Sequence, residues 1–485
     1  MRREISRVSI LVLIMFLALF TSTTVIQSVQ ADNLNADGRN SRAIQASFDI
    51  ERGAITAGGE PIAQSVPSDG VYPWQRQYPQ GELYAAVTGY NTLGQGNTGL
   101  EGAMNPQLTG QADSQFLTEI ERLLTGRDPQ GASVTTTIIP EAQMAAAEGI
   151  GDFEGAAVAM DPETGEILAM YSSPTFDPNV MTQPDGELVE AVYEELLNEP
   201  GQPLHNRAIA GDLFFPGSVF KLVIAYAALE SGDYTAESEF DNPAELSLPQ
   251  SSRVVTNSTR GACGDGDDTV TLEIAMRYSC NIPFAILAQE LGEEAINDAA
   301  TALGYGQPLT IPTQVLPSTY PQDMDDAQLM LTGFGQYDVR VTPLQVAMTT
   351  AAIANDGEMM KPNLINNVIT EDLQVLEAPG PELLGTPMTP SVAGDLQDLM
   401  VDNVENGYSS NAQIPGVTVG GKTGTAENGE ANQPFNLWFT GYAEHEGQSV
   451  VVAVVVVPPE NIAGRGSGEL AVPVGQSIME AVLNS

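Results

Sequence analysis

Lysine is nearly absent from this chain of 485 residues, which contains only Lys221, Lys361 and Lys422. Lysine and arginine together number 18 against 63 aspartates and glutamates, so the formal net charge at pH 7 is -45. A protein that binds nucleic acid needs a lysine and arginine surface to neutralise phosphates. The composition therefore excludes nucleic acid as a partner, and it predicts an acidic, solvated surface suited to salt or to a polyanionic neighbourhood.

Histidine and cysteine are also scarce, with two residues of each. His205 and His445 stand outside any motif, which argues against a Ser-His-Asp triad. The acidic turn at residues 265–268 lacks the ligand spacing of a calcium loop, so we expect no metal and no other cofactor. Cys263 and Cys280 allow one disulfide in an exported protein, and two buried free thiols are the alternative.

The N-terminus combines arginines with a long uncharged stretch. Residues 1–7 include three arginines and one glutamate, and residues 8–29 carry no charge. Such a stretch is long enough to span a bilayer with its arginine end in the cytoplasm. A signal peptide cleaved after Ala31 is the alternative. In both cases we expect the chain beyond about residue 31 to be exported.

The rest of the chain is long enough for two domains. Residues 57–130 are rich in Gly, Pro, Gln and Asn, which favours a small irregular domain. Strand patterns then occur at both ends of the later sequence, with helical patterns between them, which indicates an α+β domain built on an antiparallel sheet. The predicted strands are residues 52–56, 133–139, 155–161, 166–170, 435–442 and 450–457, and a helix is expected over 476–483. The predicted parts are a cytoplasmic tail (1–7), a transmembrane anchor (8–29), a pedestal (30–132) and a catalytic domain (133–485).

The first candidate motif is Ser218-Val219-Phe220-Lys221. Residues 219–230 are apolar at helical spacing, so Ser218 is predicted in the first turn of a helix with Lys221 on the same face. A lysine amine shifts its pKa when buried and can then act as a base, whereas a guanidinium stays protonated. The pair thus predicts a nucleophile and its base. Taken alone, the motif would be better explained by a serine cap followed by a solvated lysine.

Two further motifs follow in chain order. Ser279-Cys280-Asn281 comes after a predicted helix over 271–278, and alone it would suit capping residues. Lys422-Thr423-Gly424 follows a predicted strand over 417–419 and is flanked by glycines, which let another backbone approach the strand edge. A substrate peptide can pair with that edge while Lys422 and the threonines meet its carboxylate. The three motifs together predict one active site.

These motifs resemble those of the penicillin-binding proteins, specifically the monofunctional class B transpeptidases, and most closely the actinobacterial penicillin-binding protein A type. The resemblance runs from about residue 40 to the end and includes residues 206–208, 333–336, 341–347 and 353–357. It implies the fold of serine β-lactamases and penicillin-binding transpeptidases, an antiparallel sheet flanked by helices, with a small N-terminal pedestal and one transmembrane helix. It also implies a peptidoglycan D,D-transpeptidase that cross-links stem peptides ending in D-Ala-D-Ala and is acylated by β-lactams.

The resemblance also implies a role for each motif residue. Ser218 would attack the peptide bond, Lys221 would take its proton, and Ser279 would pass a proton to the leaving D-Ala. Asn281 would orient Lys221 and the acyl chain, and Lys422 would set the electrostatics around Ser279. Thr423, Gly424 and Thr425 would form the substrate-binding edge, with the two threonines on the terminal carboxylate, and the backbone amides of Ser218 and Thr425 would form the oxyanion hole. A Cys263–Cys280 bridge would fix the second motif.

Only about a hundred residues separate the anchor from the catalytic domain, too few for a glycosyltransferase domain with a linker. The resemblance therefore implies a membrane glycan polymerase as partner. A D,D-carboxypeptidase, with water as acceptor, and a non-catalytic scaffold of the division or elongation machinery remain open as alternatives. A serine β-lactamase is disfavoured because no Glu-x-x-Leu-Asn phrase occurs between Pro283 and Asp338.

Overall fold

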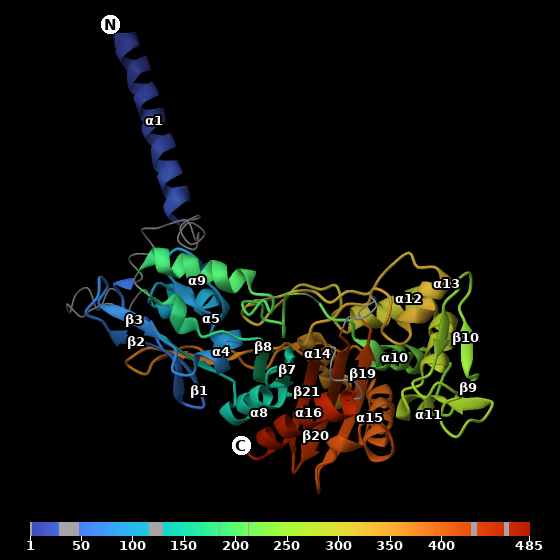
Figure 1. Ribbon diagram of the computed structural model, residues 1–485. Coiled ribbons are helices and arrows are strands. Elements are labelled where there is room, and N and C mark those ends of the chain that lie inside the picture. The colour runs from blue at the N-terminus through green and yellow to red at the C-terminus, as the bar shows by residue number, and fades with distance from the viewer. Residues whose placement is uncertain are drawn as a thin grey trace.

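The computed structural model describes residues 2–28, 48–115, 130–183, 185–211, 213–427, 434–459 and 465–485. Figure 1 shows an elongated body with helix α1 (Arg2–Ser28) standing apart from it. Within α1, the segment Ile5–Ile26 has a mean hydropathy of 2.4 and is not buried against the rest of the protein. The helix is therefore long and apolar enough to cross a membrane, although a signal peptide has the same properties.

A five-stranded antiparallel sheet forms the centre of the larger part, in the order β19-β20-β21-β7-β8. Its members are β7 (Glu154–Met160), β8 (Ile167–Ser173), β19 (Thr418–Ala426), β20 (Asn436–His445) and β21 (Gln448–Val457). The predicted hairpin and the two predicted late strands are confirmed. β19 lies at one edge and is longer than the predicted strand 417–419, because it continues through the third motif.

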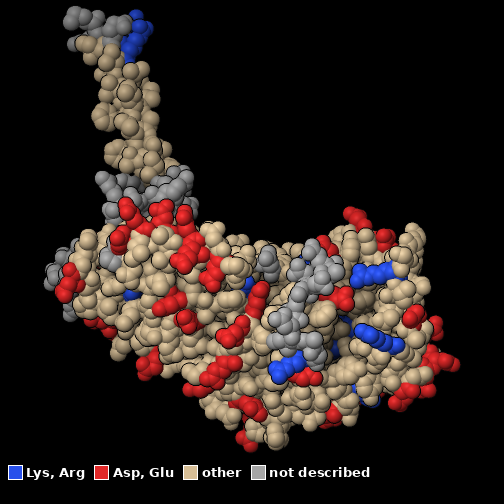
Figure 2. All heavy atoms as spheres, viewed as in Figure 1, with Lys and Arg blue, Asp and Glu red and all other residues tan. Residues whose placement is uncertain are grey.

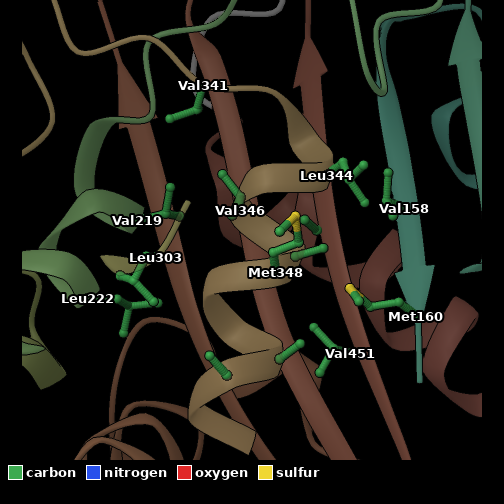
Figure 3. Packing of buried hydrophobic residues seen from close by; sticks show 14 of the residues in the cluster. Val158, Met160, Val219, Leu222, Leu303, Val341, Leu344, Val346, Met348 and Val451 are labelled. Carbon is green, nitrogen blue, oxygen red and sulfur yellow. The ribbon is translucent and has the colours of Figure 1, made fainter. Parts of the chain in front are cut away.

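Helices cover both faces of this sheet. Phe439 packs in a core with α8 (Pro140–Ile150) and α16 (Ser467–Leu483), whereas its neighbour Trp438 packs in a second core on the other face. This alternation follows from the period of two in a strand. On the second face, Figure 3 shows Leu344 and Met348 of α14 (Pro343–Ala354) on the side of the helix that faces Val158, Met160 and Val451 of the sheet.

The predicted start of the last helix at residue 476 is wrong, because α16 begins at Ser467 and continues through Pro473. Proline removes a backbone donor and usually interrupts a helix. Here the flanking residues Val472 and Val474 are buried against the sheet core, and this packing keeps the helix continuous.

A six-stranded sheet forms the other end of the body, in the order β17-β16-β6-β1-β2-β3. Its strands are β1 (Ile55–Ala57), β2 (Glu60–Pro67), β3 (Trp74–Gln77), β6 (Ser133–Thr136), β16 (Ile365–Ile369) and β17 (Val375–Glu377). β6, β16 and β17 come from beyond residue 132, so the sheet joins the predicted pedestal to later sequence. The exact domain boundaries remain predictions.

This end is packed rather than irregular, because it encloses a buried ion cluster. Arg52 and Arg76 contact the two carboxylate oxygens of Glu101 at 2.5 and 2.6 Å, and all three side chains are almost fully buried. The arginines hold the pKa of Glu101 below its usual value, although burial opposes them. Such a cluster ties the first strands to helix α5 (Gly99–Ala103).

The remaining elements connect these two sheets and carry the candidate site. They are α4 (Gly81–Thr88), α6 (Asn105–Leu108), α9 (Gly186–Asn198), α10 (Lys221–Ser231), α11 (Leu272–Arg277), α12 (Asn281–Ala302), α13 (Asp326–Thr332), α15 (Pro390–Asn406), the 3-10 turns Asp113–Gln115, Pro178–Met181, Gly217–Phe220 and Ser410–Ala412, and the short strands β4 (Asn91–Thr92), β5 (Gly96–Asn97), β9 (Glu239–Asp241), β10 (Glu245–Ser247), β11 (Val254–Thr256), β12 (Thr269–Thr271), β13 (Leu309–Thr310), β14 (Gln314–Val315), β15 (Met359–Met360) and β18 (Leu383–Gly385).

The contact of α16 with the sheet predicts that alanine substitutions at two helical glycines change the free energy of unfolding in opposite directions. A Cβ at Gly475 would lie 2.3 Å from Cδ1 of Phe439, whereas a Cβ at Gly394 in α15 meets no atom within 4 Å. Gly475→Ala should lower the free energy of unfolding by about 1–3 kcal/mol, and Gly394→Ala should raise it by roughly 0.5–1 kcal/mol. Urea denaturation followed by circular dichroism measures both, and equal effects would contradict this packing.

Candidate active site

The first motif lies where a 3-10 turn, Gly217–Phe220, continues into α10. Ser218 is half-buried, and its hydroxyl makes no hydrogen bond within the described part of the chain. Lys221 starts α10 one turn later and is fully buried. The prediction that Ser218 lies in the first turn of a helix is therefore confirmed.

The amine of Lys221 is held by two carbonyl groups of the second motif. Its Nζ donates to the backbone oxygen of Ser279 at 2.7 Å and to Oδ1 of Asn281 at 2.9 Å. Burial lowers the pKa of Lys221 well below its usual value, and the nearby charge of Lys422 lowers it further. A neutral amine has two N–H bonds, so these two acceptors satisfy both and leave its lone pair for a hydroxyl group.

The hydroxyl of Ser279 lies between the two lysines. Nζ of Lys422 donates to it at 2.8 Å, and Nζ of Lys221 lies 3.3 Å away. Lys422 also donates to the backbone oxygen of Thr423 at 2.9 Å. Burial lowers the pKa of Lys422 to about 7. Ser279 thus has proton donors or acceptors on two sides, and the protonation of Lys422 is sensitive to pH near neutrality.

An unusual backbone conformation directs Ser279 into this position. Its φ is 53°, in the left-handed region, where α11 ends. The amides of Ser279 and Cys280 donate back to the oxygens of Met276 and Ala275, which is the hydrogen-bond pattern of a helix C-cap that normally has glycine. A left-handed serine costs free energy, and such strain is typical of functional sites.

Neighbouring groups fix the second motif after Ser279. Cys280 and Cys263 form a disulfide with their Cα atoms 5.9 Å apart. The side-chain oxygen of Asn257 accepts from the backbone amides of Asn281 and Ile282 at 2.9 and 3.1 Å, so it caps α12. The sequence analysis missed Asn257, because it lies 24 residues before Asn281 in a polar segment without a motif.

The third motif lies on β19, at the edge of the sheet beside Ser218. A Cβ at Gly424 would lie 2.9 Å from the backbone oxygen of Pro216, and one at Gly217 would lie 2.6 Å from that of Thr425. Only glycine permits this approach of β19 to the serine turn. Thr423 is buried and Thr425 exposed, and the Oγ of Thr425 lies 3.1 Å from that of Ser467 at the start of α16.

The three motifs meet in one cavity of about 550 Å³. Its lining includes Ser218, Ser279, Asn281, Thr423, Gly424 and Thr425, together with Arg253, Val254, Val255, Thr256, Asn257, Ser258, Arg260, Leu331, Phe334, Gln336, Tyr408, Glu427 and Phe435. The two catalytic lysine candidates are buried and bonded to the lining residues Ser279 and Asn281. The structure thus brings every predicted motif residue to one site. Among the described residues, no group of three or more His, Cys, Asp or Glu is placed to hold a metal ion.

Comparison with known proteins gives two family matches. Residues 155–480 match the penicillin-binding protein transpeptidase domain, and residues 52–134 match the penicillin-binding protein A dimerisation domain. The peptidoglycan D,D-transpeptidases PbpA of Mycolicibacterium smegmatis and Mycobacterium tuberculosis are each 37% identical to the chain, covering 100% of it and 99% of their own length.

Solved structures give the same family. Penicillin-binding protein A from M. tuberculosis has been solved as a ceftriaxone acyl-enzyme complex, with a TM-score of 0.86 and 36% identity over 90% of this chain and 99% of that one. Its penicillin G acyl-enzyme complex has a TM-score of 0.84 and 37% identity over 90% of this chain and all of the other. The resemblance and the fold class predicted from the motifs are confirmed.

The low pKa of Lys422 predicts that stability depends on pH. The lysine loses its proton at about 7 in the folded protein and at its ordinary value of 10.5 when unfolded. Between these values unfolding takes up a proton, so the free energy of unfolding should rise with pH, by up to about 1.4 kcal/mol per unit from this group. Lys422→Met should flatten that rise in urea denaturation between about pH 7.5 and 9. An unchanged slope would show that Lys422 keeps an ordinary pKa.

Proposed function

Because the chain belongs to the transpeptidase family of the penicillin-binding proteins, we propose that Ser218 forms the acyl-enzyme and that Lys221 is its base. The protein is a serine D,D-transpeptidase of peptidoglycan synthesis, acting on stem peptides and acylated by β-lactams. One observation carries the assignment. A fully buried lysine amine, whose pKa burial depresses, lies one helical turn after a serine whose hydroxyl has no partner among the described residues.

In the proposed acylation step, the acyl group of the donor peptide is transferred to Ser218 and the terminal D-Ala leaves. The Ser218 hydroxyl gives its proton to neutral Lys221 as its oxygen bonds to the carbonyl carbon of the penultimate D-Ala. The backbone amides of Ser218 and Thr425 stabilise the oxyanion, a role supported by the close approach of Gly217 to Thr425. The peptide bond breaks when the departing D-Ala nitrogen takes a proton through the Ser279 hydroxyl.

The same groups complete cross-linking. An amine of a second stem peptide attacks the Ser218 ester, the ester bond breaks, and a new peptide bond forms. The proton lost by the attacking amine passes through the Ser279 hydroxyl to Lys221 and from Lys221 to the departing Ser218 oxygen, a route supported by the 3.3 Å contact between Nζ of Lys221 and the hydroxyl of Ser279. The donor pairs with the free edge of β19, and Thr423 and Thr425 bind its terminal carboxylate.

We also propose how the enzyme is arranged at the cell surface. The apolar helix Ile5–Ile26 anchors it as a single-pass membrane protein with its catalytic domain outside the cytoplasm. The N-terminal part acts as a pedestal and docking surface for a membrane glycan polymerase, which supplies the strands to be cross-linked. The short distance between the anchor and the transpeptidase match supports a separate polymerase.

Labelling by fluorescent penicillin tests the assignment of Ser218 and Lys221. Ser218→Ala should abolish the stable label, and Lys221→Arg should slow labelling by at least roughly a hundredfold, because a guanidinium cannot take the proton. The same gel should show a slow loss of label from the unaltered enzyme, which separates it from a β-lactamase. Lys361→Gln, which alters an exposed lysine paired with Glu382, is the control and should label normally. Persistent labelling of Ser218→Ala would remove this serine from the mechanism.

Product analysis separates the transpeptidase from a carboxypeptidase. With a pentapeptide donor and an amine-bearing stem peptide, mass spectrometry should detect the cross-linked dimer with loss of one D-Ala. If only the hydrolysed tetrapeptide forms at every acceptor concentration, the enzyme is a D,D-carboxypeptidase that uses water as acceptor. Normal growth and cross-linking in cells whose only copy is the Ser218→Ala variant would instead support a role as a non-catalytic scaffold.

A further inference from the structure

The cavity beside Ser218 contains two arginines that the mechanism above does not use. Arg253 and Arg260 are exposed residues in its lining. They stand out in a chain with 18 basic and 63 acidic residues. On the face drawn in Figure 2, the larger patches of lysine and arginine lie in the half of the body that carries α12 and β10, while acidic side chains dominate the other half.

Neither guanidinium has a partner among the residues that the structure describes. Within the described part of the chain, the side chains of Arg253 and Arg260 make no ion pair and no hydrogen bond. Other arginines of this protein do find carboxylates, as Arg277 does with Asp402 at 2.5 Å. Glu427, the acidic residue in the cavity lining, belongs to the segment after β19 and is not paired with either arginine. The two side chains thus keep their donors available for an anion.

Both arginines are attached to the second motif through short chains of hydrogen bonds. The amide of Arg260 donates to the backbone oxygen of Asn257 at 2.9 Å, and the side chain of Asn257 caps Asn281. Arg253 directly precedes β11, and the oxygen of Thr256 in β11 accepts from Nδ2 of Asn281 at 3.0 Å. The two backbones are therefore held in a fixed position relative to the groups that bind Lys221.

The geometry points to Arg253 and Arg260 as a binding site for a second carboxylate of the stem peptide, distinct from the terminal one. We infer that the enzyme selects stem peptides with a free side-chain carboxylate over those in which it is an amide. The inference rests on the proposed function, since that function places the terminal carboxylate at Thr423 and Thr425 on β19, whereas the two arginines flank β11. A planar guanidinium binds a carboxylate by two parallel hydrogen bonds, which a neutral amide cannot reproduce.

Two synthetic pentapeptides ending in D-Ala-D-Ala test the inference with the full chain in detergent. They differ only in one side-chain group, a carboxylate or its primary amide, and release of D-Ala to hydroxylamine gives kcat/KM for the donor. A second arm fixes the donor with the side-chain amide and varies the same group in the acceptor, with cross-linked product measured by mass spectrometry. The arm that responds identifies which stem peptide the arginines contact.

The unaltered enzyme should prefer the carboxylate peptide by about tenfold in one arm, as expected for a partly exposed guanidinium–carboxylate contact. Arg253→Gln combined with Arg260→Gln should reduce the preference to under about twofold while leaving use of the amide peptide unchanged. Arg253→Lys should retain part of the preference, because charge remains without the bidentate geometry. Lys361→Gln, which removes a positive charge outside the cavity, should keep the full preference and is the control for a loss of positive charge as such.

Equal use of the two peptides by the unaltered enzyme in both arms would overturn the inference and leave the proposed function intact. An equal fall in kcat/KM for both peptides in the arginine variants would also overturn the inference, since the arginines would then support the fold of the site. Labelling by benzylpenicillin, which lacks the second carboxylate, should stay normal in every variant. If penicillin labels the enzyme but neither peptide is turned over, the proposed function itself fails.

Discussion

The active site depends on the burial of two lysine amines around one serine hydroxyl. Lys221 and Lys422 are both fully buried, and both lie within hydrogen-bonding distance of Ser279. Two ammonium groups in this position would repel each other and would lose their hydration, so at least one is held neutral. That requirement explains why this lysine-poor chain keeps lysine at these positions, since arginine would remain charged.

Three separate elements must meet for this arrangement to exist. Lys221 comes from α10, Ser279 from the turn between α11 and α12, and Lys422 from the edge strand β19. Glycines allow the serine turn and β19 to approach closely, and the disulfide and the cap by Asn257 hold the turn before α12. The five-stranded sheet, of which β19 is the edge strand, is the rigid support on which these three elements are positioned.

The sequence predicted most of what is local. Ser218 in a helical turn, the hairpin of β7 and β8, and the chemical type of the site all followed from short segments. What it missed depends on distant contacts. Asn257 has no motif of its own, and the start of α16 was obscured by Pro473. The buried ion cluster around Glu101 joins the segment before β1, the strand β3 and the helix α5. Neither residue type nor spacing reveals which distant groups will satisfy a buried donor.

The strand order of the six-stranded sheet has a consequence for how the protein matures. β6 lies between β1 and β16, and β16 is contributed by residues 365–369, long after the first strands in the chain. A chain that folds as its residues become available in order therefore exposes one edge of β6 while more than two hundred further residues follow. The six-stranded sheet is complete only once β16 is available, so this edge of β6 stays open to pairing with another strand until then.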